Sequence, residues 1–202
     1  MPELFLASAS PRRASLLEQV GVRFRVCPVD IDEQWRPAET IRNYVARLAR
    51  EKCQAAAAKL PAGSAVLAAD TAGICGDTRL TKPLDQHDAI RMLMGMSGRW
   101  HTVSTAVSLY CGGQMETCIV NSEVLFRRLT RQECLAYWAT GEPCDKAGSY
   151  AIQGLGAVFV ERIVGSYSGV VGLPLCETAA LLKRFGIPCW DMAGQQHPEA
   201  CA

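Results

Sequence analysis

The sequence predicts a single α/β domain in which helices flank a mixed central sheet. Segments with helical periodicity alternate with apolar segments of strand length along the chain. Two long alternating segments joined by Gly112 and Gly113 predict an antiparallel strand pair within that sheet. The chain has 202 residues, of which 49% are hydrophobic and 20% charged, and it contains no internal repeat or low-complexity linker. Because a chain of this size and composition can bury one core, we predict one domain over residues 1–192 and a loose tail over 193–202.

The first third of the chain predicts a strand and a helix, repeated once. The helix that follows the first strand begins with Ser10 at the cap position and Pro11 in the first turn, a typical helix start. An acidic loop, Asp30 to Glu33, ends the second strand. The predicted elements are a strand over Leu4–Ala7, a helix from Pro11 to Val20, a strand over Phe24–Val29 and a helix from about Thr40 to Leu60.

The remainder predicts further strands and three helices. Thr130 followed by Glu133 is a capping box that begins one of these helices. The predicted strands are Ala65–Ala69 ending at Asp70, Ile74–Cys75 as the next strand of a hairpin, His101–Tyr110, Glu116–Arg128 and Ala157–Val164. The predicted helices are Ala89–Met96, Thr130–Thr140 and Leu175–Phe185, and the glycine-rich segment Glu142–Gly156 is predicted to be a loop.

The charge balance excludes several classes of partner. The formal net charge is only +1, with 21 basic and 20 acidic residues, so no overall field attracts nucleic acid or an anionic membrane. No apolar run approaches the length of about 20 residues that spans a bilayer. The first residues lack the basic start and long apolar stretch of a signal peptide. We therefore expect a cytoplasmic protein that binds neither nucleic acid nor membrane.

Cysteine and histidine do not predict a metal cluster. No two of the ten cysteines are spaced as Cys-x-x-Cys, and the three histidines are scattered. Reduced thiols are the simpler interpretation in a chain without a secretion signal. Any metal is therefore expected to be a hard divalent cation, Mg²⁺ or Mn²⁺, held by carboxylates and by substrate phosphates.

The segment from Ser8 to Arg13 is the first candidate for chemistry. A helix start presents unpaired backbone N–H groups and the positive end of the helix dipole. Arg12 and Arg13 add charge and bidentate donors for phosphate at the same place. The segment therefore predicts an anion cradle. The alternative from these residues alone is an ordinary capped helix with solvated arginines.

Acidic and basic side chains near strand ends are the second candidates. Glu33 closes the acidic loop, and Asp70 follows a buried strand, where an aspartate is well placed to bind magnesium or to take a proton from water. A turn or capping role is the alternative for Asp70. Lys52 and Lys82 supply charge suited to phosphates, although each taken singly is better explained as a solvated lysine.

The loop ending at Gln153 and Gly154 is the third candidate. A glutamine amide offers both a donor and an acceptor, so it can recognise the edge of a base such as uracil or thymine. The alternative is a set of structural glycine turns. The sequence contains no Walker-type loop, no complete dinucleotide fingerprint and no Gly-x-Ser-x-Gly nucleophile elbow, which disfavours the enzyme classes that carry them.

Taken together, these segments resemble the Maf family of nucleoside triphosphate pyrophosphatases. The resemblance extends from Leu4 to about Phe185 and consists of ordered blocks rather than one motif. The blocks are LASASPRR (6–13), DE (32–33), RLAREK (47–52), AADT (68–71), KP (82–83), SGRWHTVSTAV (97–107), GEPCDKAGSYAIQG (141–154) and GSYSGVVGLPL (165–175).

The resemblance implies a fold of two lobes around a substrate cleft, similar to inosine triphosphatase, usually as a homodimer. It implies that Asp70 is the proton acceptor and a metal ligand. The other phosphate-site and metal-site positions that match are Ser8, Arg13, Glu33, Lys52 and Lys82.

Three further positions match the branch of the family that resembles dTTP and UTP pyrophosphatases, namely Arg12, Thr71 and Gln153. Ala72 and Gly73 depart from the branched residues usual in the family after Thr71, which affects the expected packing of that strand.

The expected function is hydrolysis of dTTP and UTP to the nucleoside monophosphate and pyrophosphate with a divalent metal. Two alternatives stay open at this point. One is removal of modified pyrimidine nucleotides by the same reaction. The other is a non-catalytic nucleotide-binding regulator of cell division, which would bind nucleotide in the same cleft without releasing pyrophosphate.

Overall fold

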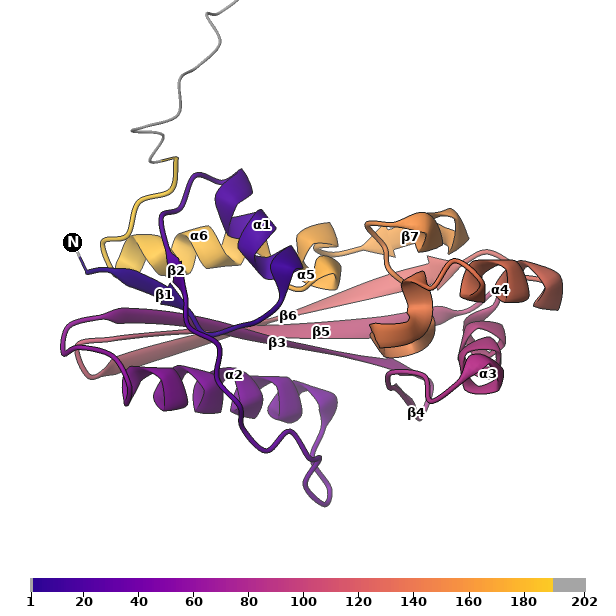
Figure 1. Ribbon diagram of the computed structural model, residues 1–202, viewed down its shortest axis with the longest axis horizontal. Helices are drawn as coiled ribbons and strands as arrows, with labels where there is room; N and C mark the ends of the chain where they lie inside the picture. The colour runs from indigo at the N-terminus through magenta and orange to yellow at the C-terminus, as the bar shows by residue number, and fades with distance from the viewer. Residues whose placement is uncertain (1, 191–202) are drawn as a thin grey trace, which may run out of the picture.

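The computed structural model describes residues 2–190 and shows a mixed α/β domain built on one seven-stranded sheet (Figure 1). The last residues of the predicted domain, 191 and 192, and the predicted tail, 193–202, lie outside the described residues. The strands follow the order β2-β1-β3-β5-β6-β7, and β4 pairs with one end of β3. Pairing is parallel between β1 and its two neighbours and antiparallel elsewhere.

The strands differ greatly in length, and the long ones run through the whole molecule. The strands are β1 Leu4–Leu6, β2 Arg25–Val26, β3 Ala65–Cys75, β4 Thr78–Leu80, β5 Trp100–Cys111, β6 Gln114–Phe126 and β7 Val160–Val164. The α-helices are α1 Pro11–Gln19, α2 Ile41–Ala57, α3 Gln86–Met96, α4 Arg131–Trp138, α5 Tyr167–Val171 and α6 Leu175–Arg184. Three short 3₁₀ helices are η1 Glu142–Asp145, η2 Ala147–Ser149 and η3 Leu155–Phe159.

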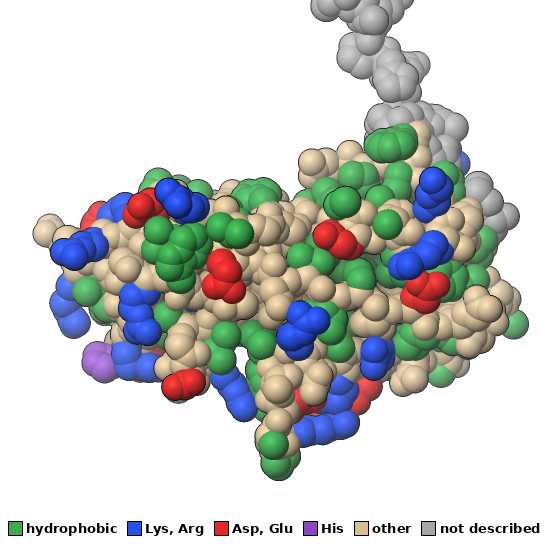
Figure 2. All heavy atoms as spheres, turned by 180° about the vertical axis from the view of Figure 1, so that it is seen from behind, with side chains coloured by type: hydrophobic (Ala, Val, Ile, Leu, Met, Phe, Trp, Pro, Cys, Tyr) green, Lys and Arg blue, Asp and Glu red, His purple; other side chains and the backbone are tan. Residues whose placement is uncertain are grey.

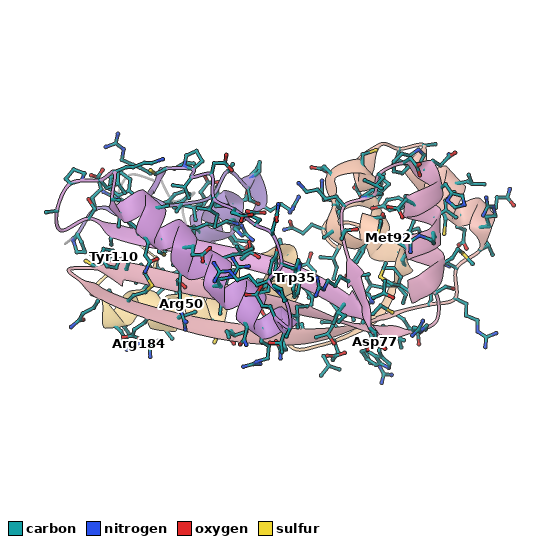
Figure 3. All side chains as sticks on the ribbon, turned by 90° about the horizontal axis from the view of Figure 1, so that it is seen from below. Trp35, Arg50, Asp77, Met92, Tyr110 and Arg184 are labelled. Carbon is teal, nitrogen blue, oxygen red and sulfur yellow. The ribbon has the colours of Figure 1, made fainter. Side chains whose placement is uncertain are left out.

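Two lobes lie at the two ends of the long strands β3, β5 and β6 (Figures 1 and 3). One lobe has α2 on one face of the sheet and α1 and α6 on the other. The second lobe contains α3, α4 and the 3₁₀ helices. Figure 2 shows the surface hollowed at its lower edge between the lobes. The expected arrangement of two lobes around a cleft is therefore present.

The buried residues form three hydrophobic clusters on the two covered faces of the sheet, because the strands alternate their side chains between these faces. Leu67 and Ala69 face the main cluster, which α1, α3 and α6 complete. Val45, Leu48 and Ala49 of α2 pack on Ala72 and Ala106 on the opposite face. Cys53 and Ala56, in the second half of α2, cluster with Val66 and Ala68 of β3 on the same face.

The strand that carries Asp70 is longer than predicted. The sequence predicts that a strand ends at Asp70 and that Ile74–Cys75 forms another, and this is wrong: β3 is one continuous strand of eleven residues. It pairs with β5 without interruption from Val66 to Ile74, so Asp70 lies in the middle of a strand, opposite Ala106. The hairpin partner of its end is β4.

Other predicted elements hold with changed limits. The capping box of Thr130 and Glu133 is confirmed, and Pro11 begins α1 as predicted. The strand predicted over Phe24–Val29 is reduced to Arg25–Val26, and the first residues of the one predicted over Ala157–Val164 form the end of η3. The short helix α5 was not predicted.

Within residues 2–190, no helix is both long enough and apolar enough to cross a membrane.

Candidate active site

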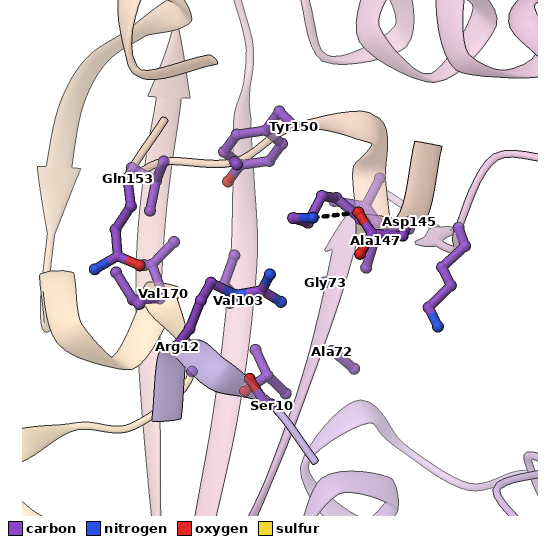
Figure 4. A pocket seen from close by; sticks show the side chains of 18 of the residues that line it. Ser10, Arg12, Ala72, Gly73, Val103, Asp145, Ala147, Tyr150, Gln153 and Val170 are labelled. Carbon is purple, nitrogen blue, oxygen red and sulfur yellow. Dashed lines mark hydrogen bonds and ion pairs between the residues drawn. The ribbon is translucent and has the colours of Figure 1, made fainter. Parts of the chain in front are cut away.

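A cavity of about 230 Å³ lies where the two lobes meet β3 (Figure 4). Ser10 and Arg12 of the α1 start line one side, and Tyr150 and Gln153 line another. Five residues predicted from the sequence line this one cavity: Arg12, Arg13, Thr71, Lys82 and Gln153. The fold therefore brings together residues that are up to about 140 positions apart in the chain.

Charge in the cavity wall is predominantly positive. The lining contains four basic side chains and one acidic side chain: Arg12, Arg13, Lys82, Lys146 and Asp145. Asp145 forms an ion pair with Lys146 (Figure 4), which neutralises that acid. Three basic side chains thus remain without an acidic counterpart in the lining, and a polyanion suits such a wall.

The start of α1 faces this cavity without a side-chain cap. Ser10 occupies the cap position as predicted, but its side chain makes no capping hydrogen bond. Ser10 N–H instead donates to Ser8 Oγ at 3.2 Å, which folds the chain back before the helix. First-turn N–H groups that no side chain caps are donors for an anion.

Arg13 is fixed by three protein acceptors. Its Nε donates to the Gly172 carbonyl at 2.9 Å, and its terminal nitrogens donate to Ser8 Oγ at 3.2 Å and Thr71 Oγ1 at 3.3 Å. Burial lowers the pKa of Arg13, while nearby Asp70 acts in the opposite direction. A guanidinium stays protonated in proteins, so Arg13 is a rigid cation that joins α1, β3 and the end of α5.

Lys52, Asp70 and Glu33 form a second cluster beside the cavity. Lys52 Nζ lies 2.7 Å from Asp70 Oδ1 and 2.7 Å from Glu33 Oε1. The Lys52 and Asp70 side chains are 11% and 10% exposed, whereas the Glu33 side chain is 56% exposed. The predicted lysine therefore forms a buried ion pair with the predicted base and a more exposed one with the acidic loop.

Burial sets the protonation behaviour of Asp70. Desolvation raises its pKa above the ordinary aspartate value, and the charges of Lys52 and Arg13 oppose that effect. A carboxylate with a raised pKa holds a proton more strongly than an exposed one. Asp70 is therefore suited to accept a proton from water.

One edge of β3 is unpaired next to the cluster and the cavity, although Glu33, Lys52 and Asp70 do not line the cavity itself. On that edge, β1 pairs with Ala65–Leu67 and β4 pairs with Gly73–Cys75. Within the described residues, no strand pairs with the five intervening positions, 68–72, on that edge. Asp70 points toward Lys52 of α2 and Thr71 toward Arg13 of α1, so these two side chains lie on opposite faces of the sheet within the unpaired stretch.

The acidic loop is held against α2 by a stack of side chains that spans the lobes. The Trp35 ring stacks on Tyr44 at 3.8 Å between centroids, and Tyr44 Oη donates to the Glu33 carbonyl at 2.9 Å. On Trp35 lies the guanidinium of Arg79, 3.9 Å from the ring centroid. Because Arg79 belongs to β4 of the other lobe, this cation–π contact fixes the loop that carries Glu33 across the cleft. Figure 3 shows Trp35 at the inner end of its lobe.

Two carboxylates are the candidate ligands of the predicted divalent cation. Glu33 and Asp70 each direct one oxygen at Lys52, which leaves the second oxygen of each as a donor. Among residues 2–190, no group of three or more His, Cys, Asp or Glu side chains forms a metal cluster. Mg²⁺ keeps several waters and binds through one or two carboxylates together with substrate phosphates. The residues present fit this mode.

Some residues of the site were not assigned from the sequence. Lys146 and Tyr150 line the cavity and lie in the predicted glycine-rich loop, of which the sequence predicts only Gln153 as a site residue. The Gly172 carbonyl and Thr105, whose Oγ1 lies 3.0 Å from Thr71 Oγ1, carry no chemical signal in a sequence. Lys146 could have been found from the sequence, because it is a basic residue within a loop that is already predicted to bind the ligand.

Tyr150 connects the cavity to a buried histidine. His101 Nε2 lies 2.8 Å from Tyr150 Oη, and the His101 ring packs edge-on against Phe126. Burial lowers the pKa of His101 to about 4. The imidazole is therefore neutral in the folded protein at pH 7.

We expect His101 to make the protein less stable as the pH falls from about 6.5 to about 4. In that window the unfolded chain binds a proton at His101 and the folded chain does not, so the free energy of unfolding decreases. A shift of this size corresponds to about 3 kcal/mol between the two limits. Urea unfolding at several pH values measures this slope.

The control variants separate His101 from other acid-sensitive groups. His101→Gln should flatten the slope, because glutamine does not titrate, whereas His87→Gln on the exposed surface of α3 should keep it. Equal slopes in wild type and His101→Gln would refute this assignment.

The chain is similar over most of its length to one protein family and to several named relatives. The family model described as Maf-like protein matches residues 3–185. A dTTP/UTP pyrophosphatase of Hahella chejuensis is 49% identical and covers 93% of this chain and 94% of its own length. The dTTP/UTP pyrophosphatases of Methylobacillus flagellatus and Vibrio cholerae are 51% and 50% identical, over 93% and 91% of this chain and 94% and 98% of their own.

The crystal structure of a nucleoside-triphosphatase / dITP/XTP pyrophosphatase from Mycobacterium abscessus covers 90% of this chain and 94% of its own, with 13% identity and a TM-score of 0.41. A similarity of this degree supports no conclusion about fold or function, so the predicted likeness to inosine triphosphatase stays a prediction.

Proposed function

The chain belongs to the Maf-like protein family, and from this premise we propose that it hydrolyses dTTP and UTP to the nucleoside monophosphate and pyrophosphate. One observation carries the proposal: relatives named dTTP/UTP pyrophosphatase are about half identical to this chain over more than nine-tenths of both lengths. The geometry supports it further, because Arg12, Thr71 and Gln153 line one cavity with basic side chains suited to a triphosphate.

The triphosphate binds against the start of α1. Arg12, Arg13 and Lys82 lie in the cavity wall and offset the negative charge of the phosphates. Arg13 is held by Ser8, Thr71 and Gly172, so it offers its remaining N–H donors in a fixed direction. Donors that are already oriented stabilise developing charge without reorganisation.

The nucleobase binds near Gln153. The Gln153 amide presents a donor and an acceptor, which match the N3–H and carbonyl groups shared by uracil and thymine. Neither base carries the exocyclic amino group of cytosine. Gln153 therefore favours dTTP and UTP over CTP, and a modified pyrimidine that keeps this edge is also a candidate substrate.

Asp70 activates the water. It takes a proton from the water as the oxygen bonds to the α-phosphorus, and the bond from that phosphorus to the bridging oxygen breaks as pyrophosphate leaves. Lys52 holds Asp70 in place and keeps its charge compensated before the proton arrives. Lys82 and Arg13 stabilise the charge that builds on the leaving group.

A divalent cation, Mg²⁺ or Mn²⁺, is part of the proposal. Glu33 and Asp70 would hold it, and when bound it would neutralise phosphate charge and polarise the reacting phosphoryl group. The partial exposure of Glu33 leaves room for the waters that such an ion keeps.

The predicted homodimer and the cytoplasmic location also belong to this proposal. The support for the location is chemical, since a nucleoside triphosphate hydrolase acts where its substrate is present. The near-neutral charge of the chain supports the expectation that it binds no nucleic acid.

The test measures pyrophosphate and monophosphate release from dTTP, UTP, CTP, GTP and 7-methyl-GTP, each with Mg²⁺, with Mn²⁺ and with chelator. We expect prompt cleavage of dTTP and UTP in the presence of metal. Tight nucleotide binding without any released pyrophosphate would instead support the non-catalytic regulator, and preference for another base would refute the dTTP/UTP assignment.

A further inference from the structure

The tight turn that carries Gln153 has no support from a helix or strand of its own. Residues 151–154 form it, with the Gly154 N–H donating to the Ala151 carbonyl at 3.2 Å. The residues from Tyr150 to Gln153 all line the cavity. The position of the Gln153 amide therefore depends on whatever holds this turn from outside the cavity.

Glu142 and Tyr137 hold both ends of the turn. Tyr137 Oη accepts the Ala151 N–H at 3.1 Å and donates to Glu142 Oε1 at 2.6 Å. The same carboxylate accepts the N–H groups of Leu155 at 2.9 Å and Gly156 at 3.0 Å. Neither side chain lines the cavity. The pair thus binds the backbone before and after Gln153 from behind.

The close packing of two glycines is independent evidence that the turn lies directly against the Glu142 and Tyr137 side chains. A Cβ atom at Gly154 would lie 2.0 Å from Glu142 Oε2, and one at Gly156 would lie 2.6 Å from Tyr137 Oη. Gly154 has φ −116°, which other residues also adopt. Glycine at 154 therefore permits the close approach of Glu142.

The pair is itself firmly anchored. Tyr137 is buried in α4 and packs edge-on against Phe159 at 5.0 Å between ring centroids. Burial tends to raise the pKa of Glu142, but the hydrogen bonds from Tyr137 and from the two backbone N–H groups outweigh it and lower the pKa. The carboxylate is therefore ionised at pH 7, and its hydrogen bonds are charge-assisted.

We propose that Glu142 and Tyr137 are positioning residues that set base selectivity by fixing the Gln153 turn. The inference rests on the proposed function and extends it to residues outside the cavity. A glutamine amide can exchange its donor and acceptor by rotation, so it distinguishes uracil from cytosine only while its surroundings fix it. Because Gln153 is proposed to contact the nucleobase and not the reacting phosphorus, loosening the turn should weaken binding and selectivity more than turnover.

Tyr137→Phe is the main test, because it removes one hydroxyl that serves both ends of the turn. We expect the KM for UTP and dTTP to rise roughly ten-fold, kcat to change less than about three-fold, and the preference for UTP over CTP to fall roughly ten-fold. Glu142→Gln should act in the same direction. Calorimetric binding of a UTP analogue with a nitrogen bridge between the α and β phosphorus atoms gives an independent readout of the same loss.

Glu133→Gln is the matched control. Glu133 also lies on α4, where it completes the capping box and pairs with Arg127, but it does not contact the turn. It should lower thermal stability and leave UTP-to-CTP preference unchanged. The proposal is overturned if Tyr137→Phe keeps wild-type KM and preference, or if Glu133→Gln loses preference equally. Failure of the proposed function appears differently, as a wild-type protein that releases no pyrophosphate from either pyrimidine.

Discussion

Replacement of Asp70 by asparagine is expected to lower turnover by about 100-fold or more, the scale of removing a general base. Asparagine keeps the shape of the side chain and an oxygen that accepts from Lys52, but it takes no proton from water. Lys52 retains Glu33 as an ionic partner at 2.7 Å, so its charge stays compensated. The variant should therefore fold and bind nucleotide while it fails to hydrolyse it. Steady-state UTP hydrolysis together with urea unfolding measures both properties.

Asp77→Asn is the control for this substitution. Asp77 is an exposed residue in the turn between β3 and β4, in the same hairpin as Asp70 (Figure 3). It should retain wild-type turnover. If a folded Asp70→Asn protein kept near wild-type turnover, Asp70 would not be the general base, and another group would have to accept the proton.

Elements determined by local sequence were predictable, and those determined by packing were not. The capping box of α4 and the proline start of α1 follow from residues adjacent in the chain. The sequence predicts a strand end at Asp70, yet β3 continues through Gly73 to Cys75. A Cβ atom at Gly73 would lie 2.8 Å from Leu80 Cδ1, so the glycine serves a close approach of β4. No local pattern distinguishes that role from a strand end.

The candidate site shows the same division. The chemistry of single residues indicated candidates for binding phosphate, metal and nucleobase. The family resemblance then implied that these candidates belong to one site. Their mutual contacts depend on the fold, since Arg13 meets a carbonyl at Gly172, 159 positions away. That carbonyl lies just after α5, a helix of five residues that is too short for a periodic pattern to reveal.

The continuity of β3 has a chemical consequence that the predicted strand end would not have given. Alternate residues of a strand face opposite sides of a sheet. Asp70 and Thr71 therefore belong to different faces, one with Lys52 and the other with Arg13. The unpaired stretch of the β3 edge contains both residues, which supports the proposal that Asp70 and the phosphate-binding residues act on one substrate.

Lys52→Met is expected to lower both stability and turnover. It leaves the buried Asp70 carboxylate without its hydrogen-bonded cation, and removing one partner of a buried pair costs about 3–5 kcal/mol. The cost should decrease as the pH falls, because protonation of Asp70 removes the uncompensated charge. Urea unfolding between pH 8 and pH 5, together with UTP hydrolysis at pH 7.5, measures these effects. Lys59→Met, at an exposed position just beyond α2, should change neither.

Lys52→Met combined with Asp70→Asn separates the structural role of the lysine from its chemical one. With no charge left at position 70, the double variant should recover most of the stability that Lys52→Met loses, since a buried neutral amide costs far less than an unpaired carboxylate. Its turnover should stay as low as that of Asp70→Asn, because no base is restored. If the double variant is as unstable as Lys52→Met alone, the lysine stabilises the fold through its packing in α2 and not through its charge.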